Sequence, residues 1–317
     1  MTQRILRLSN SEMATWRRCH RKWYLGVYRK LQRKRSPTAG TPIVIGNLVH
    51  DALAEYYDPA LKTDPLEQLN RVLDQRAVNN PFDETDIEKD RALVTIMLEG
   101  YLEWLEESGA DQEIEILGTE RMVEVPIVKS ELLQINLLSK LDAPVLRHSD
   151  EARLAFEHKT VGSLTDPLPT LKLDTQLLTE HLALFLHNLG QGMDPIEAHR
   201  SCQGILYNML RKVKRTAAAK PPFYDRVEIP HNLEELRNHW RHVVGVAREI
   251  DLATRRLDAG ENHHAVTVPN PTKNCSWDCP FFAVCVMADD GSDFEGALDD
   301  LFEERDPLER YEEAEAL

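Results

Sequence analysis

Residues 140–160 carry a predicted β-hairpin with acidic and basic side chains near its open end, and they read KLDAPVLRHSDEARLAFEHKT. Two strand-like stretches flank residues 148–151, whose composition is typical of a turn. A hairpin centred on the middle of this turn puts Asp142 directly opposite Glu157. Because the β-carbons of directly opposed residues lie roughly 4.5–5.5 Å apart, the sequence predicts two carboxylates side by side.

Two carboxylates held this close repel each other unless a cation or a proton lies between them. A hard divalent ion with oxygen ligands is the natural occupant, so Asp142 and Glu157 are candidate metal ligands. The two-residue period of a strand puts Lys159 on the same face as Glu157 and turns the His158 side chain away. There the ammonium group can orient a water molecule or stabilise charge on a phosphate. The same register places Lys140 opposite Lys159, and a solvated face with ion pairs is the alternative explanation.

Four cysteines near the two ends of the chain form a second candidate metal site. Three are closely spaced at Cys275, Cys279 and Cys285, and Cys19 is more than 250 positions away. Thiolates favour zinc or iron, so either zinc or an iron–sulfur cluster would tie the two ends together. Five cysteines make an odd number that does not fit a disulfide framework, which favours a reducing cytoplasm. We expect Cys202 to be a small buried residue.

Charge is distributed unevenly along the chain. The net charge of −15 argues against a surface adapted throughout to nucleic acid. Residues 1–35, however, carry eleven Lys or Arg and one acid, whereas residues 289–317 carry thirteen Asp or Glu and two Arg. A basic arm can hold phosphates locally, and a solvated helix face is the alternative. We expect residues 289–317 to form a flexible acidic tail because they contain few apolar residues.

Periodicity predicts helices around a mainly antiparallel sheet. Ser9 and Glu12 match a capping box, which opens a helix with Cys19 on its apolar side beside Trp16 and Trp23. Further helices are predicted over 44–57, 64–109 with a break at 79–81, 171–189 and 232–257, and strands over 120–128, 132–147 and 152–161. No linker divides the chain cleanly, so we expect one domain over residues 1–288. The chain has no apolar run long enough for a bilayer and no signal-peptide pattern, which predicts no membrane partner.

Six stretches of the sequence match, in order, the motifs of a known nuclease family. They are Leu8 to Leu25 around the first cysteine, Gly46 to His50, Lys140-Leu141-Asp142, Phe156 to Thr160, Gln176-Leu177 and the last three cysteines. Over roughly residues 5–288 the chain resembles the PD-(D/E)XK nuclease superfamily. Within it, the chain resembles the RecB-like iron–sulfur exonucleases, which include CRISPR-associated exonucleases and phage-encoded relatives. Three features depart from the pattern: Ser139 where Gly is usual, Glu180 where Tyr is usual, and the spacing of the C-terminal cysteines.

The resemblance implies an α/β, restriction-endonuclease-like core, with a mixed central sheet flanked by helices and helical insertions. It also implies a cluster of the 4Fe–4S type, with zinc as the less favoured occupant, on Cys19, Cys275, Cys279 and Cys285. It implies that His50, Asp142, Glu157 and the His158 carbonyl bind one or two Mg²⁺ or Mn²⁺ ions. Lys159 would then assist the attacking water, and Gln176 would fix the geometry of the site. Taken alone, His50, which lies near the start of the predicted helix, is better explained as a capping or packing residue, and only the ordered set of motifs reverses this.

Three functions follow from these patterns as competing hypotheses. The first is a metal-dependent DNA exonuclease that acts on single strands or ends, in phage or prokaryotic recombination, repair or CRISPR-type processing. The second is a non-catalytic DNA-binding or assembly factor, and the third is a zinc-stapled interaction protein. The intact Lys159 favours the first, because a binding module does not need it. Candidate DNA contacts are Arg17, Arg21, Lys22, Arg211 and Lys212, and candidate protein partners are recombination or CRISPR-type proteins in a prokaryotic or phage-infected cytoplasm.

Overall fold

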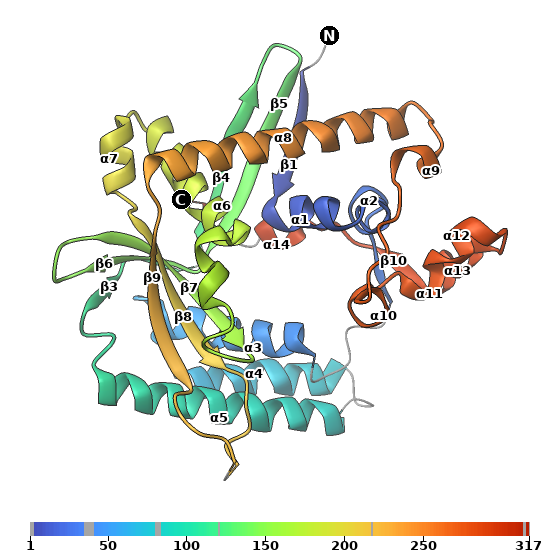
Figure 1. Cartoon of the computed structure of the whole chain (residues 1–317). Helices are drawn as coiled ribbons and strands as arrows, with labels where there is room; N and C mark the ends of the chain where they lie inside the picture. The colour runs from blue at the N-terminus through green and yellow to red at the C-terminus, as the bar shows by residue number, and fades with distance from the viewer. Residues whose placement is uncertain are drawn as a thin grey trace. The chain divides into compact units, whose positions relative to one another are not determined.

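The computed structural model describes residues 3–34, 41–79, 84–119, 121–216, 218–312 and 315–316. The chain divides into two compact units. The first comprises Met1–Ser36, Glu124–Ser139 and Arg237–Ala314, and the second comprises Pro37–Val123, Lys140–Leu236 and Glu315–Leu317. Each unit combines strands with helices (Figure 1), which confirms the predicted mixed α/β class. One nuclease domain over residues 1–288 stays a prediction.

The second unit contains a five-stranded mixed sheet in the order β3-β6-β7-β8-β9. Its strands are β3 (Ile114–Ile116), β6 (Ala143–Arg147), β7 (Arg153–Val161), β8 (Gly204–Arg211) and β9 (Tyr224–Pro230). β7 runs parallel to β8, and the other neighbours pair antiparallel. β6 and β7 pair from Ala143 with Phe156 to Leu146 with Arg153, which confirms the predicted hairpin register.

The single strand predicted over residues 132–147 is in fact two strands that belong to different sheets. β5 (Leu133–Leu141) pairs in parallel with β1 (Arg4–Ser9), whereas β6 pairs with β7. Asp142 lies at the break between them. Because Lys140 belongs to β5, the predicted pairing of Lys140 with Lys159 is wrong. β4 (Arg121–Lys129) and β11 (Glu315–Ala316) complete the second sheet in the order β1-β5-β4-β11.

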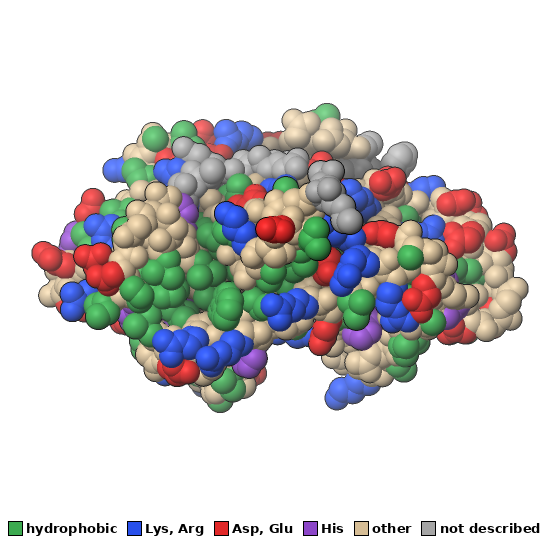
Figure 2. All heavy atoms as spheres, turned by 90° about the horizontal axis from the view of Figure 1, so that it is seen from above, with side chains coloured by type: hydrophobic (Ala, Val, Ile, Leu, Met, Phe, Trp, Pro, Cys, Tyr) green, Lys and Arg blue, Asp and Glu red, His purple; other side chains and the backbone are tan. Residues whose placement is uncertain are grey.

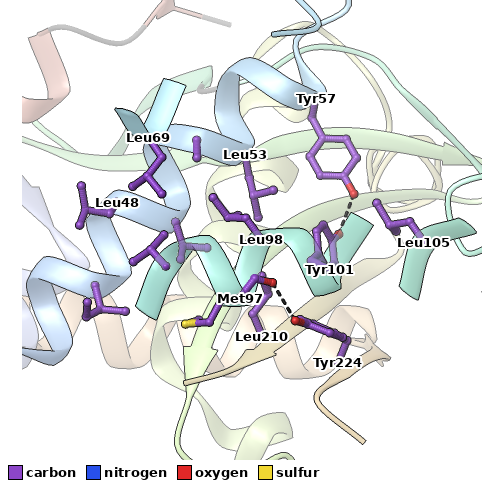
Figure 3. Packing of buried hydrophobic residues seen from close by; sticks show 14 of the residues in the cluster. Leu48, Leu53, Tyr57, Leu69, Met97, Leu98, Tyr101, Leu105, Leu210 and Tyr224 are labelled. Atoms are coloured by element: carbon purple, nitrogen blue, oxygen red, sulfur yellow. Dashed lines mark hydrogen bonds between the residues drawn. The ribbon is translucent and has the colours of Figure 1, made fainter. Parts of the chain in front are cut away.

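Three helices pack on one another and against the β7 and β8 strands: α3 (Pro42–Tyr57), α4 (Pro65–Asn79) and α5 (Glu84–Ser108) (Figure 1). Figure 3 shows their apolar side chains, among them Leu53 and Leu98, packed together with Leu210 of β8. The hydroxyl groups of Tyr57 and Tyr101 are hydrogen-bonded at 2.6 Å within this core. The unit is completed by η3 (Leu168–Leu173), α6 (Thr175–Gly190) and α7 (Pro195–Arg200). These bounds confirm the helices predicted for this part of the chain; the break predicted at 79–81 lies partly outside the described residues.

The predicted capping box is present at the start of α1 (Asn10–Arg18). The backbone N–H of Ser9 donates to Glu12 Oε2 at 2.7 Å, and the Ser9 hydroxyl accepts from the Glu12 N–H at 3.3 Å. The helix ends at Cys19, whose backbone is extended, and α2 (His20–Trp23) and η1 (Tyr24–Tyr28) follow. Trp16 and Trp23 are buried edge to face, with ring centroids 5.0 Å apart, but Cys19 is only half-buried. The helix break accounts for this difference from the sequence prediction.

The C-terminal part of the first unit is helical for most of its length. Its elements are α8 (Leu233–Asp258), α9 (His263–Val266), α10 (Cys275–Asp278), α11 (Phe282–Cys285), α12 (Met287–Asp290), α13 (Phe294–Leu301), β10 (Phe302–Glu304) and α14 (Glu309–Glu312). β10 pairs antiparallel with β2 (Leu31–Arg33). Leu298 and Phe302 are buried with Leu25 and Phe281. The segment for which the sequence predicts flexibility therefore contains an apolar face, which its acidic composition hides.

No described helix is long and apolar enough to cross a membrane.

Candidate active site

Three side chains from β7 and α6 form a closed hydrogen-bonded set in the second unit. Lys159 Nζ donates to Gln176 Oε1 at 2.8 Å and lies 3.3 Å from Glu157 Oε1. Gln176 Nε2 donates to the same Glu157 oxygen at 2.8 Å. Strand alternation puts Glu157 and Lys159 on one face of β7, and the Asp174 side chain caps α6 so that Gln176 lies in its first turn. The structure therefore brings these three predicted site residues together.

Asp142 and His50 form the other half of the site. Asp142 Oδ2 accepts a hydrogen bond from the His158 backbone N–H at 2.8 Å and lies 3.3 Å from His50 Nδ1. His50 comes from the middle of α3, not from near its start as the sequence predicts. Asp142 lies between β5 and β6 and is not part of the strand pairing of either sheet. Its carboxylate instead accepts a hydrogen bond from the backbone of β7.

The His158 side chain points away from Glu157 and Lys159, as strand periodicity predicts. Its ring lies parallel to Tyr57 with centroids 5.2 Å apart, and its Nδ1 lies 2.9 Å from Asn208 Nδ2. Burial lowers the pKa of His158 to about 3, so the ring is neutral. Its backbone N–H donates a hydrogen bond to the Asp142 carboxylate.

Burial and close charges shift the proton affinities of the site residues in opposite directions. Burial raises the pKa of the Glu157 carboxyl, and the Asp142 carboxylate raises it further. Burial opposes ionisation of Asp142 too, but His50 outweighs it and lowers the Asp142 pKa. Burial disfavours a charged His50, yet Asp142 raises the pKa of the imidazole to about 9. The raised pKa values of Glu157 and His50 mean that protons on these two groups compensate the crowded acidic charge, and a bound cation would take the place of those protons.

Comparison with known proteins identifies the family. A family model described as the PD-(D/E)XK nuclease superfamily matches residues 7–286. The chain belongs to the PD-(D/E)XK nuclease superfamily. No curated protein matches its sequence. A solved structure titled "Crystal structure of SSO0001" is 18% identical and covers 66% of this chain and 80% of its own, with a TM-score of 0.30.

Nucleases of the PD-(D/E)XK superfamily use divalent ions such as Mg²⁺ or Mn²⁺. The donors present here suit such an ion, because Asp142 and Glu157 offer carboxylate oxygens and His50 offers an imidazole nitrogen. A cavity of ≈ 10 Å³, about the size of one water molecule, lies between His50, Asp142 and their neighbours. Within the described ranges, no three His, Cys, Asp or Glu side chains have the arrangement of a formed metal site.

All four predicted cluster cysteines lie in the first unit. The Asn270 N–H donates to Cys19 Sγ at 3.4 Å, and the Thr272 N–H donates to Cys275 Sγ at 3.3 Å. Burial raises the pKa of Cys279, and charges on Cys19 and Cys275 raise it further, so these three thiols interact electrostatically. Arg21 Nη1 lies 3.8 Å from Cys285 Sγ. The thiols are free, and N–H groups directed at sulfur suit thiolate ligands of iron or zinc.

The predicted DNA contacts differ in how accessible they are. Arg17 is exposed and Lys22 is half-buried. The Arg21 side chain is only 4% exposed and forms two hydrogen bonds with Asp289, at 2.7 and 2.8 Å. Arg211, the last residue of β8, donates to the Lys220 carbonyl at 3.1 Å, and the following residue, Lys212, is half-buried. Arg17 and Lys22 therefore reach a polyanion more readily than Arg21 does.

One residue of the site escaped the sequence prediction. Glu180 of α6 is 4% exposed, and its Oε1 accepts from Gln176 Nε2 at 2.9 Å. Burial raises the pKa of Glu180 well above its usual value, and Glu157 raises it further. The signal that could have found it is spacing, because residues four apart on a helix are neighbours.

Proposed function

We propose that this protein is a metal-dependent DNA exonuclease that hydrolyses phosphodiester bonds at single strands or ends and carries an iron–sulfur cluster. The observation that supports it best is the hydrogen-bonded set of Glu157, Lys159 and Gln176 beside Asp142 and His50. A solvated sheet face would not bury Glu157, whose residue is 2% exposed. Membership of a nuclease superfamily supports hydrolysis of phosphodiester bonds as the reaction of these residues.

The ligands of the divalent ion would be His50, Asp142, Glu157 and the His158 carbonyl. Mg²⁺ or Mn²⁺ bound there would supply Lewis-acid stabilisation of charge on the scissile phosphate. Lys159 would hold its proton, orient the attacking water and stabilise negative charge on the phosphate oxygens. Gln176 accepts a hydrogen bond from Lys159 Nζ, so it would aim the ammonium group. Asp142 and Glu157 would otherwise repel the phosphate, which is why both need a cation.

Substitution of the site residues tests the proposed activity. Asp142→Ala or Glu157→Ala should abolish cleavage of end-labelled single-stranded DNA with Mn²⁺. Lys159→Ala should lower the rate by a factor of about 10² or more, the usual size for one positioned acid–base or electrostatic group. Lys172→Ala is the control, because that exposed lysine forms an ion pair with Glu235 outside the candidate site, so the variant should cleave normally.

Two results would contradict the enzyme hypothesis. One is a wild-type protein that binds DNA but cleaves none with Mg²⁺ or Mn²⁺, which would favour the non-catalytic DNA-binding factor. The other is a fully active Lys159→Ala variant. Linear and circular single strands then separate the two modes of cleavage, since an exonuclease degrades the linear form and leaves the circle intact.

The proposed iron–sulfur cluster would be bound by Cys19, Cys275, Cys279 and Cys285. Protein prepared without oxygen should be brown with broad visible absorption, because thiolates ligate iron. Changing any one of the four to Ser should remove the colour and destabilise the fold, since the cluster joins residues far apart in the chain. Cys202→Ser is the control, because Cys202 is buried and its thiol lies 3.6 Å from the Gly204 carbonyl. A colourless protein with one tightly bound zinc would contradict the cluster and leave the ligands in place.

The DNA contacts follow from accessible charge. We assign Arg17 and Lys22 on one unit and Arg211 and Lys212 on the other, with Arg21 engaged elsewhere. Phosphate contacts position the strand without reading its sequence. A role in recombination, repair or CRISPR-type processing, with protein partners from those systems, fits an exonuclease that acts on ends.

A further inference from the structure

Glu180 is a buried carboxylate that the proposed reaction does not use. It lies one helical turn after Gln176 on α6 and is 4% exposed. Its Oε1 accepts a hydrogen bond from Gln176 Nε2 at 2.9 Å, while its Oε2 is buried and has no hydrogen-bond partner among the residues that the structure describes. Burying a carboxyl group with one oxygen unpaired is costly, so this position calls for a functional explanation.

Three ionisable neighbours form hydrogen bonds with the side-chain amide of Gln176 and occupy both of its N–H groups and its oxygen. Nε2 has two hydrogens and lies 2.8 Å from Glu157 Oε1 and 2.9 Å from Glu180 Oε1. Its Oε1 accepts from Lys159 Nζ at 2.8 Å. A flipped amide would direct hydrogens at the ammonium and oxygen at both carboxyl groups, so only one orientation is compatible with all three neighbours.

Glu180 removes the remaining freedom of this amide. Without Glu180, one N–H of Gln176 would have no acceptor, and the amide would be held only by its bonds to Lys159 and Glu157. The Gln176 backbone is already fixed, because its N–H donates to Asp174 Oδ1 at 2.7 Å. Backbone and amide are thus both held, and the oxygen that accepts the hydrogen bond from Lys159 Nζ has a fixed position.

We infer that Glu180 is a positioning residue, which holds the Gln176 amide and through it the Lys159 ammonium in the geometry that cleavage requires. This inference rests on the proposed nuclease function. In the described structure the side chain makes its hydrogen bond to Gln176 alone. The Glu180 side chain supplies a hydrogen-bond acceptor for Gln176 at a fixed position.

Steady-state kinetics with Mn²⁺ and end-labelled single-stranded DNA test the inference. Glu180→Leu should lower kcat about 10-fold with little change in KM, because orientation is lost and DNA contacts are not. Glu180→Gln keeps an acceptor oxygen and should retain most of the wild-type kcat. The control Asn188→Ala loses a hydrogen bond of the same helix, to Ser201 outside the site, and should be fully active. Equal losses in Glu180→Gln and Glu180→Leu would mean that charge matters, and would overturn the inference.

A double-mutant cycle separates a role through Gln176 from an independent one. In a Gln176→Ala background, Glu180→Leu should cause no further loss of kcat, because the amide that it positions is gone. If the two losses multiply instead, Glu180 acts on its own and the inference is wrong.

A measurement without turnover keeps this test separate from that of the nuclease function. In ¹⁵N-labelled protein, the side-chain amide signals of Gln176 are those missing from Gln176→Ala. We expect them to be slow to exchange with solvent, to lose this protection in Glu180→Leu and to keep it in Glu180→Gln. Absence of cleavage by the wild type would defeat the proposed function, whereas unchanged Gln176 signals in Glu180→Leu would defeat this inference.

Discussion

His181 is a buried titratable residue that the proposed site does not need. Its Nε2 lies 2.7 Å from the Cys202 carbonyl, which can only accept, so Nε2 carries the proton. Its Nδ1 lies 3.2 Å from Nδ1 of His231. Burial lowers the pKa of His181 to about 3, and the neighbouring His231 and His199 lower it while Glu235 opposes them. The folded protein therefore keeps this imidazole neutral.

We predict that His181 makes the protein less stable in acid. Below its ordinary pKa of 6.5 the unfolded chain binds a proton that the folded chain does not, so stability falls as pH falls from about 6.5 towards about 3. Between about pH 7.5 and pH 5, urea unfolding of the wild type should lose about 2 kcal/mol that His181→Gln does not lose. The exposed His148→Gln is the control and should follow the wild type. Equal losses in wild type and His181→Gln would contradict the prediction.

At the scale of single residues, most of the candidate site could be predicted from the sequence. Asp142, Glu157 and Lys159 could be related to each other because a short hairpin sets its own register through the turn and the two-residue period. His50 and Gln176 lie on separate helices, so only the family resemblance connected them to the hairpin. Glu180 was noticed as a departure and not as a site residue, because its contact with Gln176 depends on the packing of α6.

At the scale of elements, the breaks were harder to predict than the elements themselves. Residues 132–147 read as one strand because the apolar pattern continues through Asp142, and only the partners β1 and β7 decide where it divides. The parallel pairing of β7 with β8 joins residues about 50 positions apart, for example Glu157 with Tyr207, and no local pattern encodes it. The helix break at Cys19 is likewise not encoded locally, because the sequence around it is typical of a continuous helix.

A single arginine links four elements of the second unit. Arg226 on β9 donates to Tyr57 of α3 at 2.9 Å, Tyr101 of α5 at 2.8 Å and Asn208 of β8 at 2.9 Å, and to Asp111 before β3 at 2.6 Å. Its side chain is only 8% exposed. Asn208 in turn contacts the ring of His158, so this network supports the strand that carries the candidate site.

We predict that Arg226→Met destabilises the protein by about 3 kcal/mol, because the buried hydroxyl and carboxyl groups lose a charged donor. Arg147→Met is the matched control: it also lies in this sheet and pairs with two carboxylates, Asp150 and Glu228, but these are more exposed. We expect it to cost about 0–1 kcal/mol. Urea unfolding of both variants decides the question, and similar losses would show that the network adds nothing beyond an ordinary surface pair.

At the scale of the whole molecule, the described side chains seen in Figure 2 include Lys and Arg as well as Asp and Glu, with apolar side chains among them. Basic and acidic segments from the two ends of the chain also pair within the first unit. Arg29 bonds to Glu295 at 2.8 Å and Lys30 to Asp306 at 2.7 Å, next to the pairing of β2 with β10. The basic arm is therefore partly neutralised, and any contact with DNA competes with these acidic side chains.

We predict that Glu295→Gln together with Asp306→Asn tightens DNA binding at low salt. The change frees Arg29 and Lys30 for phosphates, and both acids are about half exposed or more, so the fold should lose little stability. If both cations then bind a single strand, the plot of log affinity against log salt concentration should steepen by about 1.4. Deleting the whole segment is a poorer test, because Leu298 and Phe302 belong to a core. The control is Glu106→Gln with Glu107→Gln, exposed acids of the other unit that change net charge equally. Equal affinity and slope in the two double variants would show that the effect is only one of net charge, and that the acidic segment does not compete with DNA.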